Sequence, residues 1–300
     1  MGHSQTHGYL FGLGAVLIWS GFILVSRLGG LSDLNHYDVI ALRYGTCAVI
    51  VLPVWWFKFR FNLWQFKYLA VALVGGIAYA LTTFHGFQLA PASHGALLLP
   101  GSMPLFIFVL ALLVGQSSWS VQKMLGVIVI TVGIGALFYG QFLSAHVDIN
   151  IIKGDGLFLL GALCWGVFSV MIKHWGVSPW QATISIAILT ALMYLPVYVL
   201  FAPKQISQEV MPDILTQMVY QGFLATIVQL LLFVRAVELI GAANMGSLMA
   251  FVPLIAGVSA LIIFNEPVTA TLVLGLMLVA FGAWFSHSRL IEKMFHKPIL

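Results

Sequence analysis

The two halves of this 300-residue chain resemble one another, and this duplication constrains the fold more than any other feature of the sequence. When the second half is moved back by 149 residues, glycines, prolines and apolar positions coincide over a long stretch without a gap. The coinciding pairs include Gly126 with Gly275, Gly133 with Gly282, Pro104 with Pro253, Phe84 with Phe233 and Leu99 with Leu248. With an offset three residues shorter, Trp19 coincides with Trp165. The duplication predicts two repeats of one folding unit, joined near the middle of the chain.

The composition places both repeats in a lipid bilayer. Apolar residues make up 61% of the chain and charged residues only 7%, which is too few charges for the surface of a soluble domain of this size. A membrane-spanning helix needs about 20 apolar residues, and the sequence contains ten apolar segments of suitable length. We predict an all-α membrane protein with transmembrane helices at 8–26, 37–57, 68–90, 93–115, 124–142, 156–175, 179–201, 215–237, 242–264 and 268–286.

The number of helices in each repeat determines how the repeats are related. Five is an odd number, so a second repeat that follows directly on the first must cross the membrane in the opposite orientation. We therefore predict two inverted five-helix repeats, residues 1–145 and 146–300. Basic residues test this arrangement because they concentrate on the cytoplasmic side of membrane proteins. With a cytoplasmic N-terminus, that side holds Lys58, Arg60, Lys67, Lys123, Lys173, Arg235, Arg289, Lys293 and Lys297, and the opposite side holds only Arg27, Lys153 and Lys204. Both termini are thus predicted to be cytoplasmic, and the net charge of +4 reflects orientation rather than nucleic-acid binding.

Three sequence phrases, in this order, carry a resemblance to a known family. They are Leu17-Ile18-Trp19-Ser20-Gly21-Phe22 in the first predicted helix, Ala41-Leu42-Arg43-Tyr44 in the second, and the alanine-rich connection leading to the helices of Pro104 and Pro253. In these features the chain resembles the EamA-type exporters of the drug/metabolite transporter superfamily, and most of all the YddG-type exporters of aromatic amino acids. The resemblance spans nearly the whole chain and implies two five-helix halves. Family members usually carry Gly-Glu after each proline helix. Here the second half has Asn265-Glu266 and the first has Gly115-Gln116, so no essential acid is expected in the first half.

Aromatic and polar residues at mid-membrane depth form the candidate binding site. Trp19 and Trp165 lie far from both ends of their helices, where the polar indole N–H requires a protein partner or a cavity. Transporter sites lie at the repeat interface, which favours a cavity, while packing between the repeats is the alternative. The other candidate substrate-binding residues lie on helix faces expected to point inward: Tyr79, Thr83, Ser169, Gln229, Asn244 and Ser247. For Thr83 an interhelical hydrogen bond is the alternative role, and for Asn244 a helix cap.

Ionisable residues inside the predicted helices are few. Arg43 could hold a substrate carboxylate, or its long side chain could reach the outer interface and brace a neighbouring helix. His85 and His94 lie near the outer ends of adjacent helices and are candidate proton or carboxylate partners, although a histidine at a helix end is ordinarily solvated. The acids nearest the spans all lie near helix ends: Asp38, Asp155, Glu238 and Glu266. Because no span carries an acid near its middle, we expect facilitated export, with proton antiport through a histidine as the alternative.

Pro104 and Pro253 are candidate hinges. Each proline removes a backbone hydrogen bond from its helix. Bends at these equivalent positions would let helix ends close alternately over a central cavity. A static kink is the alternative, since prolines are tolerated in membrane helices.

These expectations combine into a secondary transporter that exports small organic solutes by alternating access between the two halves. Aromatic and neutral amino acids are the expected substrates, and a proton-coupled multidrug or metabolite exporter of the same superfamily is the alternative. A polytopic membrane enzyme is a distant alternative, because the chain lacks the motifs His-Glu-x-x-His and Gly-x-Ser-x-Gly and has no paired intramembrane aspartates. We expect no cofactor, metal or catalytic residue. The expected partners are a small-molecule substrate and the lipid of a bacterial inner membrane, with the protein a monomer or weak homo-oligomer.

Overall fold

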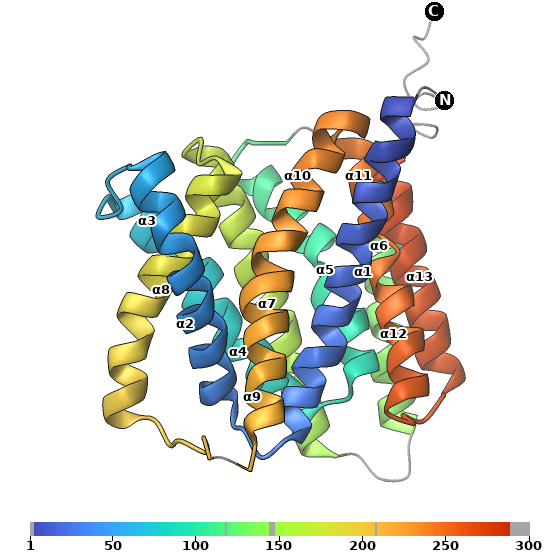
Figure 1. The fold of residues 1–300 in the computed structure, drawn as a ribbon. Helices are drawn as coiled ribbons and strands as arrows, with labels where there is room; N and C mark the ends of the chain where they lie inside the picture. The colour runs from blue at the N-terminus through green and yellow to red at the C-terminus, as the bar shows by residue number, and fades with distance from the viewer. Residues whose placement is uncertain (1–2, 118, 144–147, 208, 289–300) are drawn as a thin grey trace, which may run out of the picture.

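The computed structural model describes residues 3–117, 119–143, 148–207 and 209–288, and every regular element within them is helical (Figure 1). In chain order the elements are α1 (His3–Leu31), α2 (His36–Val54), η1 (Trp55–Phe59), α3 (Phe66–Val71), η2 (Ala72–Ala78), α4 (Tyr79–Leu89), α5 (Ala92–Leu113), α6 (Val121–Leu143), α7 (Ile149–His174), α8 (Pro179–Phe201), α9 (Met211–Gln217), η3 (Met218–Val228), α10 (Gln229–Ile240), α11 (Ala242–Met249), α12 (Val252–Ile263) and α13 (Ala270–His287). Within the described residues they form 10 segments long and apolar enough to cross a membrane, which confirms the predicted fold class.

The third and eighth spans, equivalent in the two repeats, each change helix type midway. In the third, the wider π-helical turns of η2 separate α3 from α4, and in the eighth those of η3 separate α9 from α10. A π-helical turn contains an extra residue and rotates the side chains that follow it relative to those before it. The first residues after the two π-helical segments are Tyr79 and Gln229. Both line the cavity described below.

The fourth and ninth spans respond differently to their equivalent prolines. α5 continues through Pro100 and Pro104, whereas a turn at Ala250 and Phe251 divides the ninth span into α11 and α12. Pro253 lies in the first turn of α12, where its missing N–H costs no intrahelical hydrogen bond. A bend was predicted at both prolines, but the helix is interrupted near Pro253 only.

The last helices of the two repeats, α6 and α13, pack together along a seam of glycines that shows the symmetry of the fold. A Cβ atom on Gly126 would lie 2.7 Å from the carbonyl oxygen of Gly282, and a Cβ on Gly282 would lie 2.7 Å from the oxygen of Gly126. Gly133 and Gly275 form the same reciprocal contact, at 2.9 and 2.8 Å. Gly126 and Gly275 are equivalent, as are Gly133 and Gly282, so each contact is exchanged with the other by the inversion of the repeats. Only glycine allows the two backbones to approach so closely.

The helices alternate in direction, so the start of α1 and the end of α13 lie at the same end of the bundle, called here the upper end (Figure 1). The upper end also carries Lys58, Arg60, Lys67, Lys123, Lys173 and Arg235, and the lower end carries Arg27, Lys153 and Lys204. Arg289, Lys293 and Lys297 lie outside the described residues. Helices of one repeat pack mainly on helices of the other: α1 on α10, α4 on α7, α2 on α8 and α5 on α12.

Candidate functional site

A cavity of about 610 Å³ lies between the two repeats. Its size falls within the range of about 300–1,000 Å³ that is typical of small-molecule sites. It reaches the surface at the upper end, where the exposed residues Lys123, Lys173 and Pro179 line its mouth. Its inner end includes Phe22 and Arg43, and Arg43 lies about two helical turns from the lower end of α2. The cavity is therefore open at one end of the bundle and extends past its middle.

Three of the candidate aromatic residues meet in this cavity. The rings of Trp19 and Trp165 lie edge to face with their centroids 5.6 Å apart, and the ring of Tyr79 lies 5.1 Å from that of Trp165. Gln229, Pro104 and Pro253 also line the wall. The π-face and edge geometry of such rings suits contact with an apolar or aromatic group of a solute.

Arg43 turns toward the cavity and does not reach the lower interface. Its Nη1 donates a hydrogen bond of 2.8 Å to Oε1 of Gln221, on the eighth span. Its guanidinium carbon lies 5.2 Å from the ring centroid of Phe22, 5.7 Å from that of Tyr44 and 5.9 Å from that of Phe84. Arg43 therefore does not extend to the membrane surface, but its bond to Gln221 does brace a neighbouring helix, as the structural alternative expected. The aromatic rings and Gln221 surround the guanidinium.

Besides His94, five of the candidate residues lie away from the cavity wall. Thr83 is fully buried against α7, where a Cβ on Gly161 would lie 2.9 Å from its Oγ1. The hydroxyl of Ser169 donates to the carbonyl of Trp165 at 2.7 Å, and Nδ2 of Asn244 donates to the carbonyl of Ile240 at 2.8 Å. His85 stacks on His36 with ring centroids 4.4 Å apart, and Ser247 is not among the residues around the cavity. Nδ2 of Asn244 thus bonds the last residue of α10 and does not cap α11, whose N-cap residue is Gly241.

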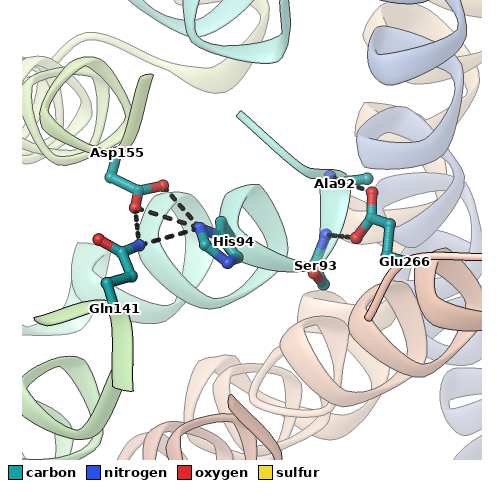
Figure 2. Close-up of polar contacts among 6 residues, drawn as sticks. All are labelled: Ala92, Ser93, His94, Gln141, Asp155 and Glu266. Atoms are coloured by element: carbon teal, nitrogen blue, oxygen red, sulfur yellow. Dashed lines mark hydrogen bonds and ion pairs between the residues drawn. The ribbon is translucent and has the colours of Figure 1, made fainter. Parts of the chain in front are cut away.

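At the lower end of the bundle, the start of α5 makes two sets of polar contacts with other segments, which Figure 2 shows. The Nδ1 atom of His94 lies 3.0 and 3.1 Å from the two carboxylate oxygens of Asp155, and Nε2 of Gln141 also donates to this carboxylate. The side chain of Asp155 is 0% exposed and that of His94 is 13% exposed. The expectation of a solvated His94 was therefore wrong, because α7 begins at Ile149 and carries Asp155 inside the bundle.

Glu266 makes the second set of contacts. Its carboxylate oxygens accept hydrogen bonds from the backbone N–H groups of Ala92 (2.6 Å) and Ser93 (2.9 Å). The N-cap residue of α5, Pro91, makes no capping bond with its own side chain. An acid near the end of the second repeat thus caps a helix of the first repeat, where a negative charge also favours the helix dipole.

Several residues that line the cavity or contact Arg43 were not predicted from the sequence. Gln221 was not predicted as the partner of Arg43, because the two residues are 178 positions apart in the sequence. Phe22 and Tyr44 are the last residues of the two sequence phrases that contain Trp19 and Arg43, and this proximity was a usable signal. Nothing in the sequence around Thr226 or His287 distinguishes these lining residues from residues that pack between helices.

Comparisons with known proteins are consistent with this architecture. The EamA-like transporter family matches the chain twice, at residues 6–139 and 152–287. A solved structure titled only as the crystal structure of a protein is 18% identical and superposes with a TM-score of 0.66, covering 97% of this chain and 99% of that one. At this identity the likeness shows the fold alone. No match was found among curated proteins. Because the family matches both five-helix repeats, the chain belongs to the EamA-like transporter family.

Proposed function

We propose that this chain exports aromatic and other neutral amino acids by alternating access, as a facilitator without a coupled ion. The observation that supports it most is the aromatic lining of the cavity between the repeats, where Trp19, Tyr79 and Trp165 meet. The halves 1–145 and 146–300 move against each other, with Pro104 and Pro253 as hinges. Because the repeats are inverted, each repeat can adopt the conformation that the other has in this structure. The state open at the upper end then becomes a state open at the lower end. The resemblance to YddG-type exporters supports the substrate class.

The proposal places the protein in a bacterial inner membrane with both termini in the cytoplasm. The excess of basic residues at the upper end supports this orientation. In this orientation the cavity opens to the cytoplasm, and the contacts of Asp155 and Glu266 close the outer end. This is the state that takes up substrate for export.

Counterflow into proteoliposomes tests the proposal. The purified protein is reconstituted with unlabelled amino acid inside, and entry of labelled phenylalanine, tryptophan or leucine is followed. We expect saturable exchange that Trp165→Ala reduces by about tenfold or more, since removing a large apolar side chain from such a contact loses about 1.5–3 kcal/mol. Trp64→Ala, at a 70% exposed position away from the cavity, serves as the matched control and retains wild-type exchange. Absence of exchange with every amino acid would contradict the proposed substrates.

Proton-coupled export of a metabolite is the second candidate, and the buried pair of His94 and Asp155 favours it. A histidine against a buried carboxylate is an arrangement that transporters use to carry protons. An imposed pH gradient separates the two candidates: it drives uphill accumulation in a coupled exporter and leaves the equilibrium distribution of a neutral substrate unchanged in a facilitator.

A further inference from the structure

Arg43 carries a positive charge that the described part of the protein leaves without a negative partner. The ion pairs found among the described residues join His94 to Asp155 and Arg235 to Glu238, and neither involves Arg43. The hydrogen-bond partner of Nη1 is the neutral amide of Gln221, and the Nε atom is buried without any hydrogen-bond partner. Because a lone charge inside the membrane is costly, such residues ordinarily pair with an anion or mark the path of a solute.

The surroundings of Arg43 hold its guanidinium in place. Nε2 of Gln221 donates to Oγ of Ser26 at 3.0 Å, and that hydroxyl donates to the carbonyl of Phe22 at 2.6 Å. The chain of bonds orients the amide so that its oxygen faces Arg43. With Phe22, Tyr44 and Phe84 packed around it, the guanidinium is already positioned before any solute arrives, which lowers the entropic cost of binding one.

The charges around the cavity all have the same sign. Arg43, Lys123 and Lys173 line it, and no lining residue in the described part of the chain is acidic. The two lysines lie at the mouth, where basic residues are expected in any protein of this orientation, so they attract anions but do not define a site. Arg43, at the inner end, is the residue that the membrane environment leaves unexplained.

We propose that Arg43 binds the carboxylate of the transported solute, and that the substrates are organic carboxylates in which an ammonium group is tolerated but not required. This inference rests on the proposed function only in that a small organic solute occupies the cavity. A carboxylate can accept hydrogen bonds from the planar guanidinium through both its oxygens, which makes these among the strongest hydrogen bonds in proteins. The rings of Trp19, Tyr79 and Trp165 contact the apolar remainder. An organic cation that lacks a carboxylate meets Arg43 and no acid, so the cavity selects against it.

A ligand series on the wild-type protein tests this selectivity. Binding of L-phenylalanine, 3-phenylpropionate, 2-phenylethylamine and hexanoate to the purified protein in nanodiscs is measured by isothermal titration calorimetry. The first three share one phenylethyl frame and differ in whether it carries a carboxylate, an ammonium group or both. We expect phenylalanine and 3-phenylpropionate to bind about 10- to 100-fold more tightly than 2-phenylethylamine, the ratio that hydrogen bonds to a charged group provide. Equal binding of the amine and the carboxylate would overturn the proposal.

Variants assign the selectivity to one residue. Arg43→Gln is expected to lose about 10- to 100-fold in carboxylate affinity, and Arg43→Lys, which keeps the charge but not the fork of donors, to lose less. Arg235→Gln removes an exposed arginine outside the cavity and is expected to bind like the wild type. Wild-type carboxylate affinity in Arg43→Gln contradicts the assignment.

The series also separates failure of this inference from failure of the proposed function. Arg43-dependent binding of hexanoate without binding of any aromatic ligand contradicts the aromatic substrates and supports the carboxylate site. Equal binding of the aromatic carboxylate and the aromatic amine contradicts the carboxylate site and supports the aromatic substrates. If no carboxylate in the series binds, the carboxylate site is refuted.

Discussion

The hydrogen bonds of Glu266 to the start of α5 allow us to predict how much free energy this contact loses when the carboxylate is replaced. Its carboxylate accepts hydrogen bonds of 2.6 and 2.9 Å from the backbone N–H groups of Ala92 and Ser93. Glu266→Gln keeps the size of the side chain but removes its charge and one of its two acceptor oxygens. Hydrogen bonds to a charged group contribute about 1.5–3 kcal/mol and helix caps about 0.5–2 kcal/mol. For the half-buried Glu266 we therefore expect the closed contact to lose about 1–2 kcal/mol.

Hydrogen–deuterium exchange followed by mass spectrometry measures this loss at the site itself. The amides of Ala92 and Ser93 exchange when the contact opens, and about 1–2 kcal/mol corresponds to exchange about 5 to 30 times faster. Glu266→Ala, which removes both acceptors, is expected to show at least the same increase. Glu238→Gln is the matched control, because Glu238 makes an exposed ion pair with Arg235 at the other end of the bundle.

Unchanged exchange at Ala92 and Ser93 in Glu266→Ala would refute the reasoning, since it would mean that water replaces the carboxylate at no cost. Faster exchange over the whole chain would indicate general destabilisation, not opening of one contact. In a transporter that alternates between two states, weakening the lower closure also shifts the population toward the state open at the lower end.

Three further predictions follow from packing, buried charge and orientation. Gly133→Ala places a Cβ 2.9 Å from a backbone oxygen of α13 and is expected to lower stability by about 1–3 kcal/mol. Gly135→Ala is the matched control, because a Cβ at Gly135 meets nothing within 4 Å. Its melting temperature should be unchanged or slightly raised. Asp155→Asn breaks a buried pair with its histidine partner and is expected to cost about 3–5 kcal/mol in thermal unfolding; an unchanged melting temperature would contradict this. A membrane-impermeant maleimide applied to intact cells is expected to label Gln205→Cys but not Asn62→Cys, and the opposite pattern would reverse the proposed orientation.

The contrast between the fourth and ninth spans shows where sequence patterns stop being sufficient. Pro104 and Pro253 are equivalent in sequence, yet α5 is continuous and the ninth span is divided at Ala250 and Phe251. Equivalent prolines thus lie in two different backbones, and their flanking residues, such as Pro100 against Met249, differ as well. The shifts caused by η2 and η3 were likewise not readable from apolar length, although they set which face Tyr79 and Gln229 present.

The ten membrane-length helices among the described residues, and the inverted relation of the two repeats, could both be predicted from the sequence. Both follow from properties that sum along the chain, namely the length of apolar segments, the parity of helices and the repeat of glycines and prolines. Which polar groups meet, in contrast, is set by the packing of the helices. His94 and Asp155 are 61 residues apart, Glu266 and Ala92 174, and Arg43 and Gln221 178. Each of these contacts depends on how helices distant in sequence pack, and in a bilayer a polar side chain takes whichever partner that packing brings within reach.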